Sequence, residues 1–207
     1  MSDFFLIRYG PEILQRMGEH LLLVGVAIAI AIGVGIPLGV LITRQTALCQ
    51  PILAIANILQ TVPSLAMFGL LIPLVGIGPV PAIIALTLYS FLPIIRNTYT
   101  GITGVDAAVR QAGEGMGMTD WQLLVQVEFP LALSVILAGV RVATVIAVGI
   151  ATIAAAIGAG GLGVFIFRGI AVVNNDLILA GAVPAAAIAL LADYGIGWLE
   201  SRFAVKR

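Results

Sequence analysis

The chain has 207 residues, of which 61% are hydrophobic and 10% are charged, and its mean hydropathy is +1.16. A soluble domain carries about 25% charged residues, so this apolar excess requires a lipid environment. The net charge is zero and the pI is about 6.6. This balance excludes recruitment of nucleic acid or of an acidic surface by overall charge.

Apolar runs between charged residues predict an all-α integral membrane protein, a polytopic helical bundle that forms one membrane domain over residues 1–207. No Asp, Glu, Lys, Arg or His lies between Arg44 and Arg96, a stretch long enough for two helices of about 20 residues. The runs lack the period-2 alternation of barrel strands, which favours helices. Five spans are expected, at residues 21–43, 52–75, 80–95, 131–157 and 177–198.

The orientation follows from the short-loop cations. Five spans put the two termini on opposite sides, and Lys and Arg concentrate in cytoplasmic loops. With the N-terminus outside, the outer side has three cations and the inner side has six, the latter being Arg44, Arg96, Arg110, Arg202, Lys206 and Arg207. We therefore expect a multi-pass protein of the inner (cytoplasmic) membrane with its N-terminus outside and its C-terminus cytoplasmic.

Cysteine and histidine offer little chemistry. Cys49 is the only cysteine, which excludes an internal disulfide, and nothing in the chain resembles a metal cluster. We expect no metal site. His20 is the only histidine and lies where the first span enters the lipid, so it is expected to be an interfacial anchor without a functional role.

The longest hydrophilic segment, residues 106–130, is expected on the inner side. Asp106 is predicted to cap a first short helix, and Thr119 with Gln122 forms a capping box that opens a second one. That second helix is expected to end just before Pro130, which would open the fourth span. Apolar side chains in this loop need a cover, either the protein's own helix ends or a groove on a partner. They are Met116, Met118, Trp121, Leu123 and Leu124.

A family pattern decides between those covers. The series Gln111-Ala112-Gly113, three residues, Gly117, nine residues, Val127-Glu128-Phe129-Pro130 resembles the EAA loop of ABC importer permeases. That loop reads Glu-Ala-Ala, three residues, Gly, nine residues, Ile-x-Leu-Pro. The present chain departs from it at Gln111, Gly113, Val127 and Phe129, and the change at Gln111 removes a carboxylate.

Three further segments resemble the osmoprotectant branch, the glycine betaine/carnitine/choline permeases. They are residues 60–66, Gln-Thr-Val-Pro-Ser-Leu-Ala, residues 89–97, Tyr-Ser-Phe-Leu-Pro-Ile-Ile-Arg-Asn, and residues 157–163, Ile-Gly-Ala-Gly-Gly-Leu-Gly. The resemblance implies a type I ABC importer (MetI-like) permease fold and import of such a compatible solute. The chain would be a transport subunit and not an enzyme.

The resemblance also implies the partners. A cytoplasmic ATPase subunit would bind ATP and Mg, with no cofactor in this chain, and its groove would hold the coupling loop at about residues 106–130. An extracytoplasmic binding protein would deliver the solute, and a second permease, either another copy or a paralogue, would complete the path. The coupling residues expected on this basis are Gln111, Ala112, Gly113 and Gly117, joined by Met118, Trp121 and Pro130.

Polar and glycine-rich positions in the spans are candidates for the solute path or its gate. They are Gln60, Thr61, Pro63, Ser64, Tyr89, Gly160 and Gly161. For a single polar group, a hydrogen bond between helices is an open alternative, and for the glycines it is close helix packing. The glycine cluster is not expected to bind nucleotide, since no strand precedes it.

Arg141 is the one charge expected within a span. It is either functional or a side chain that extends to the inner interface. The second interpretation is favoured because no Asp or Glu is expected inside a span to pair with it. The same expected absence argues against a proton-coupled carrier and an intramembrane enzyme. Import of methionine or another amino acid, and a stand-alone channel, remain alternatives.

Overall fold

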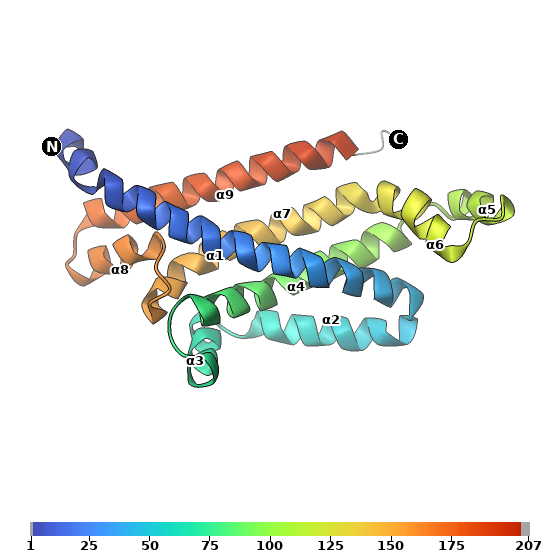
Figure 1. The fold of residues 1–207 in the computed structure, drawn as a ribbon, viewed down its shortest axis with the longest axis horizontal. Coiled ribbons are helices and arrows are strands. Elements are labelled where there is room, and N and C mark those ends of the chain that lie inside the picture. The colour runs from blue at the N-terminus through green and yellow to red at the C-terminus, as the bar shows by residue number, and fades with distance from the viewer. Residues whose placement is uncertain (1, 204–207) are drawn as a thin grey trace.

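The computed structural model describes residues 2–203, and the side chains from Tyr9 to Phe203. Within these residues every regular element is helical (Figure 1). The α-helices are α1 (Ser2–Arg44), α2 (Thr46–Thr61), α3 (Ser64–Val75), α4 (Pro79–Thr103), α5 (Ala107–Gly115), α6 (Asp120–Leu123), α7 (Phe129–Ile153), α8 (Gly163–Ala171) and α9 (Asn175–Phe203). A π-helical turn, Leu124–Glu128, joins α6 to α7, and a 3-10 turn, Ala154–Ile157, follows α7.

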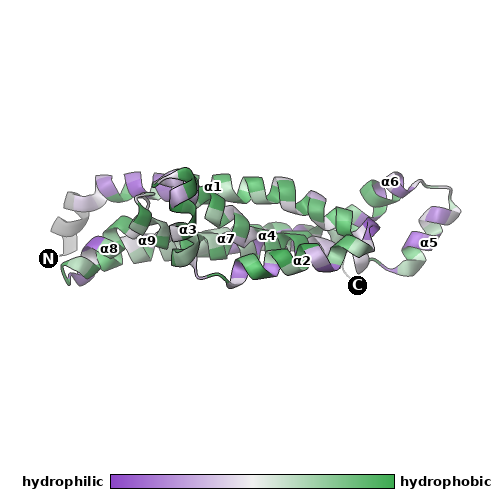
Figure 2. Ribbon diagram, turned by 90° about the horizontal axis from the view of Figure 1, so that it is seen from below, coloured by the Kyte–Doolittle hydropathy of each residue, from purple (hydrophilic) through white to green (hydrophobic). Residues whose placement is uncertain are grey.

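The expected all-α membrane bundle is confirmed. Four segments are long and apolar enough to cross a membrane alone, Tyr9–Arg44, Pro79–Thr103, Asp120–Ile157 and Asn175–Phe203. A fifth crossing is present if α2 and α3 count as one span. Figure 2 shows hydrophobic residues along most of the bundle, with hydrophilic residues gathered at its two ends and on α5.

The second expected span, residues 52–75, is wrong as a continuous helix. It is broken between α2 and α3, which are bent by 100°. Val62 is extended there, with ψ 129°, because a residue that precedes a proline is pushed out of the helical region. Pro63 then stands immediately before α3. At 16 residues, α2 is only about 24 Å long, less than the roughly 30 Å of a bilayer core.

Helix α4 lies at the centre and packs against both α1 and α7. Glycines allow the close approach: a Cβ on Gly39 of α1 would lie 2.5 Å from Thr98 Cβ, and one on Gly139 of α7 would lie 2.7 Å from the Pro93 carbonyl oxygen. The main core runs between these helices and includes Leu23, Ala27, Phe68, Leu86, Ala143 and Ala147. The central three helices therefore form a tightly packed unit.

The two ends of the bundle differ. The start of α1 lies at the end that carries α8, whereas α5, α6 and the end of α9 lie toward the opposite end (Figure 1). Lys206 and Arg207, counted above as inner cations, lie outside the described residues. In this arrangement the long 106–130 loop and the end of α9 lie toward the same end of the bundle.

Candidate functional site

The loop between α4 and α7 begins with the expected cap. Asp106 Oδ1 accepts a hydrogen bond from the Ala108 amide at 2.8 Å, which satisfies one of the free N–H groups at the start of α5. The helix ends at Gly115, and Gly117 follows with φ +81°. A left-handed conformation favours glycine because any other side chain is strained there. Gly117 thus turns the chain sharply at the tip of the loop.

The second helix of the loop also starts as expected. Thr119 N donates to Gln122 Oε1 at 2.9 Å, and Gln122 N donates to Thr119 Oγ1 at 3.3 Å, a complete capping box. Its expected end before Pro130 is wrong. The helix passes directly into α7, and the π turn Leu124–Glu128, where the regular α-helical bonding changes, immediately precedes the segment that contains Pro130. The loop tip is therefore rigidly continuous with α7.

At the loop tip, some side chains are buried between α5 and α6 and others are exposed. Gly113 is buried, and a Cβ there would lie 2.7 Å from Leu123 and 3.3 Å from the Met118 sulfur, so α5 packs directly on α6. Met116 and Trp121 remain 72% and 71% exposed. The exposed set also includes Val109, Gln111, Ala112 and Gly117. Large apolar side chains left in the open on a rigid tip indicate a docking surface.

An ion network underlies the loop, and the sequence analysis missed it. Glu128, the last residue of the π turn, is 1% exposed and pairs with Arg44 Nη2 at the end of α1. Arg110 Nε of α5 lies 3.2 Å from Glu128 Oε1, an ion pair without the alignment of a hydrogen bond. Arg110 Nη2 also donates to the Ile102 carbonyl of α4. The available signal was Glu128 itself, a carboxylate directly before an apolar span.

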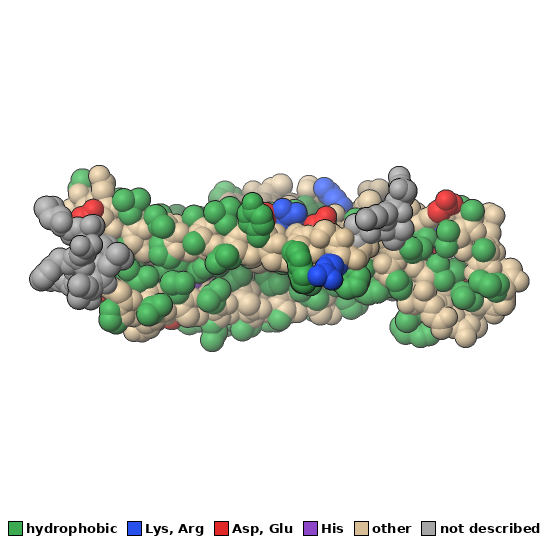
Figure 3. Space-filling model, turned by 90° about the horizontal axis from the view of Figure 1, so that it is seen from above, with side chains coloured by type: hydrophobic (Ala, Val, Ile, Leu, Met, Phe, Trp, Pro, Cys, Tyr) green, Lys and Arg blue, Asp and Glu red, His purple; other side chains and the backbone are tan. Residues whose placement is uncertain are grey.

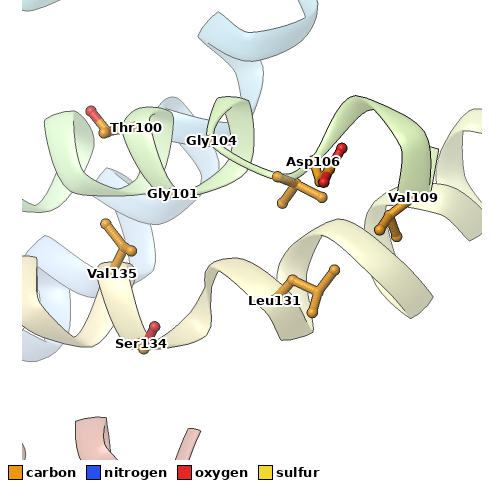
Figure 4. A pocket seen from close by; sticks show the side chains of 9 residues that line it. Thr100, Gly101, Gly104, Asp106, Val109, Leu131, Ser134 and Val135 are labelled. Atoms are coloured by element: carbon orange, nitrogen blue, oxygen red, sulfur yellow. The ribbon is translucent and has the colours of Figure 1, made fainter. Parts of the chain in front are cut away.

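A cavity of about 830 Å³ lies beside this network, between the end of α4, the start of α5 and the first half of α7 (Figure 4). Thr100, Asp106 and Ser134 supply its polar wall, and Val109 and Leu131 part of its apolar wall. No aromatic ring is among its lining residues. It therefore lacks the rings that recognise quaternary ammonium ions.

The candidate path residues gather at the break between α2 and α3. Tyr89 of α4 is 3% exposed and its hydroxyl donates to the Val62 carbonyl, which holds the break against α4. Thr61 is exposed and its hydroxyl donates to the Ile58 carbonyl of its own helix at 2.7 Å. Gln60, Pro63 and Ser64 lie at the same break, partly or fully exposed. The structure thus brings these five candidates together.

Gly160 and Gly161 lie elsewhere, in the turn before α8, with φ +82° and +77°. The Gly161 amide donates to Glu19 Oε2 at 2.9 Å. His20, expected at the lipid interface, is instead fully buried: its Nε2 lies 3.2 Å from the Val148 carbonyl oxygen, and a Cβ on Gly161 would lie 3.2 Å from its Nδ1. The reason is that α1 packs this face against α7 and the glycine turn.

The expectation of an unpaired Arg141 is wrong. Its guanidinium pairs with Asp193 of α9 and, at 3.4 Å, with Glu200. The three side chains are 30 to 36% exposed. Figure 3 shows acidic and basic side chains gathered over the C-terminal part of α9, next to hydrophobic side chains. Asp193 lies inside the fifth expected span, at residues 177–198, and was the signal overlooked in the sequence.

Metal chemistry has no visible basis in the part of the chain that the structure describes. There, no group of three His, Cys, Asp or Glu side chains could hold a metal ion. Cys49 is buried and forms no disulfide.

Comparison with known proteins identifies one family. The family described as "Binding-protein-dependent transport system inner membrane component" matches residues 35–205. The carnitine transport permease protein OpuCB of Listeria monocytogenes is 45% identical over 197 residues, which cover 95% of this chain and 90% of that protein. The glycine betaine/carnitine/choline transport system permease protein OpuCD of Bacillus subtilis is 49% identical over 192 residues, covering 92% and 84%.

The fold has solved counterparts as well. An inward-facing structure of the MetNI methionine ABC transporter matches with a TM-score of 0.84 at 24% identity, covering 93% of this chain and 96% of that chain. A second crystal form of the same transporter matches with a TM-score of 0.83 at 23% identity. At such identities the likeness concerns the fold alone. The expected MetI-like architecture is confirmed.

Proposed function

The chain belongs to the family of inner membrane components of binding-protein-dependent transport systems, and we propose that it imports a quaternary ammonium osmoprotectant with ATP hydrolysed by a separate subunit. The solute class is that of the relatives, which are named for carnitine, choline and glycine betaine transport and share 44 to 49% identity with this chain. The likeness to the methionine transporter concerns the fold alone, so it does not favour methionine as a second candidate solute.

The observation that carries the proposal is the exposed tip of the 106–130 loop. Met116 and Trp121 project from a short two-helix hairpin that is continuous with α7. A short amphipathic element of this kind fits a groove on a partner, and its rigid connection lets the partner's movement reach the membrane helices. The partner is a cytoplasmic ATPase, with Gln111, Ala112, Gly117 and Trp121 on the docking surface.

Two more partners complete the transporter. A second permease, either another copy or a paralogue, encloses the path, and the break between α2 and α3 with Tyr89 lies along that path. An extracytoplasmic binding protein delivers the solute at the end of the bundle that carries α8 and the Gly160–Gly161 turn. In this orientation the N-terminus is outside and the C-terminus is cytoplasmic, in agreement with the cation distribution.

Uptake by cells tests the solute class. The chain is expressed with its ATPase and binding protein in bacteria that lack osmoprotectant uptake. We expect uptake of radiolabelled glycine betaine, carnitine or choline and growth at high osmolarity, with no competition from excess methionine. Methionine uptake without osmoprotectant uptake would contradict the proposed solute class. Solute entry in cells that lack the ATPase would instead indicate a channel.

A further inference from the structure

One buried carboxylate connects the loop hairpin to the rest of the bundle. Each oxygen of Glu128 faces a different arginine, Arg110 from α5 and Arg44 from α1. Arg110 also donates to the Ile102 carbonyl near the end of α4. A single network therefore joins α5 to α1, α4 and the start of α7, and its Arg44–Glu128 pair links residues 84 positions apart.

Burial makes this network hard to take apart. Glu128 is 1% exposed, whereas the Arg44 and Arg110 side chains are 38% and 29% exposed. A carboxylate enclosed in protein is strongly destabilising once its partners leave, so the three side chains are expected to move together. Glu128 also ends a π-helical turn, a geometry that is rare and concentrates at functional positions.

On the face of α5 that borders the cavity, packing alone does not hold the helix in place. Val109, the neighbour of Arg110, lines the 830 Å³ cavity between α5, α4 and α7 (Figure 4). The α4–α5 connection beside that cavity is short and contains Gly104. A hairpin with open space on one face can tilt, unless another contact fixes it to the membrane helices.

We propose that Glu128 is a positioning residue for energy coupling. It fixes α5 to the inner ends of α1 and α4, so that a displacement imposed by the ATPase on the hairpin moves these helices with α7 as one body. The family pattern has Glu where this chain has Gln111, whereas both ion pairs of Glu128 lie within this chain. This inference rests on the proposed function, since it assumes an ATPase at the hairpin.

A distance measurement tests the rigid connection without transport. Spin labels are placed at Leu41→Cys of α1 and Ala108→Cys of α5, both exposed positions, in a Cys49→Ala background within the assembled complex in lipid nanodiscs. We expect one narrow distance distribution, unchanged between the nucleotide-free and ATP-bound states, and a broadened distribution in Glu128→Gln. An equally narrow distribution in Glu128→Gln would overturn the proposal.

Energy coupling supplies the second readout. In proteoliposomes we expect Glu128→Gln and Arg110→Lys to raise the ATP hydrolysed per solute about tenfold, the scale of one charge-assisted contact. Arg110→Lys keeps the charge but loses the planar guanidinium that contacts both Glu128 and Ile102. Because Arg110 is partly exposed, this variant can still be measured if the Glu128→Gln complex does not assemble. The control Arg202→Lys, at an exposed position in the last turn of α9, keeps the normal ratio.

The outcomes separate the two proposals. An ATP-to-solute ratio that stays normal in both variants, while uptake and hydrolysis fall in proportion, would show that the network is only structural. A wild-type complex that imports no solute would contradict the proposed function, and the label distances would still report on the network.

Discussion

Arg141 and Asp193 form a two-pronged ion pair between α7 and α9, with Nε to Oδ1 at 2.6 Å and Nη2 to Oδ2 at 2.7 Å. Gly197 makes room for it, since a Cβ there would lie 3.1 Å from Arg141 Nη1. The parallel geometry requires the planar guanidinium, which a lysine cannot reproduce. A charge inside an expected span that is paired in this way is a functional candidate.

Substitution of Arg141 tests this geometry. We expect Arg141→Lys to lower uptake about tenfold and Arg141→Leu to lower it further, since the leucine leaves Asp193 unpaired. The control is Arg202→Lys: Arg202 lies over the Trp198 ring at 4.6 Å, and a lysine retains that cation–π contact. Uptake by Arg141→Lys at the level of the control would contradict the role of the planar guanidinium.

Gly117 tests the loop tip. Its φ of +81° makes Gly117→Ala strained by about 1 kcal/mol, although a Cβ there would meet no atom within 4 Å. We expect Gly117→Ala to weaken ATPase stimulation several-fold and Gly117→Arg to abolish transport, with normal amounts of permease in the membrane. Gly115→Ala, also in open space but with ordinary helical φ, should leave transport intact. Loss of Gly117→Arg from the membrane would point to a structural role.

Tyr89 tests the break in the second span. The Tyr89→Phe variant removes the hydrogen bond to the Val62 carbonyl, worth about 1 kcal/mol, and keeps the ring in the core. We expect the α2–α3 break to become more mobile, and a cysteine at Ser64 to react several-fold faster with a small water-soluble reagent. Tyr194→Phe, at a residue 78% exposed, is the matched control and should leave the rate unchanged. Equal rates in the two variants would contradict this role.

The pair Gly158 and Gly161 tests the turn before α8. Both have φ +77°, so alanine strains the backbone equally, but only at Gly161 would the new Cβ lie 3.2 Å from His20. We expect Gly161→Ala to lower uptake more than Gly158→Ala, because the displaced turn also loses its contact with Glu19. Equal effects would mean that backbone strain alone explains both.

Local patterns predicted local structure well, and long-range pairing poorly. The Asp106 cap and the Thr119–Gln122 capping box depend on residues at most three apart, so the sequence displays them directly. Arg141 and Asp193 are 52 residues apart, and their meeting depends on how α7 packs on α9. The Arg44–Glu128 pair spans 84 residues for the same reason.

The broken second span had a local signal that was given too little weight. Val62 precedes Pro63, and a residue before proline is disfavoured in a helix. The hydropathy of residues 52–75 is continuous, so composition alone predicted one helix through the break. The lesson for His20 is similar: its position at the edge of an apolar run predicted the interface, whereas the packing of α1 against α7 and the glycine turn buries it.

Topology is tested by labelling single cysteines in a Cys49→Ala background. A cysteine at Gln15, near the start of α1, is expected to react with an impermeant reagent added outside, and one at Ser201, in the last turn of α9, only after the membrane is opened. Labelling of Ser201→Cys from outside would reverse the proposed orientation.

The central claim is most directly tested by solute uptake into proteoliposomes that contain this permease with its ATPase, supplied with the binding protein outside and ATP inside. The predicted result is accumulation of a quaternary ammonium osmoprotectant against its gradient, with no uptake when the ATP, the binding protein or an intact Gly117 loop tip is missing. Equilibration of the solute without ATP, or accumulation that needs neither partner, would contradict it.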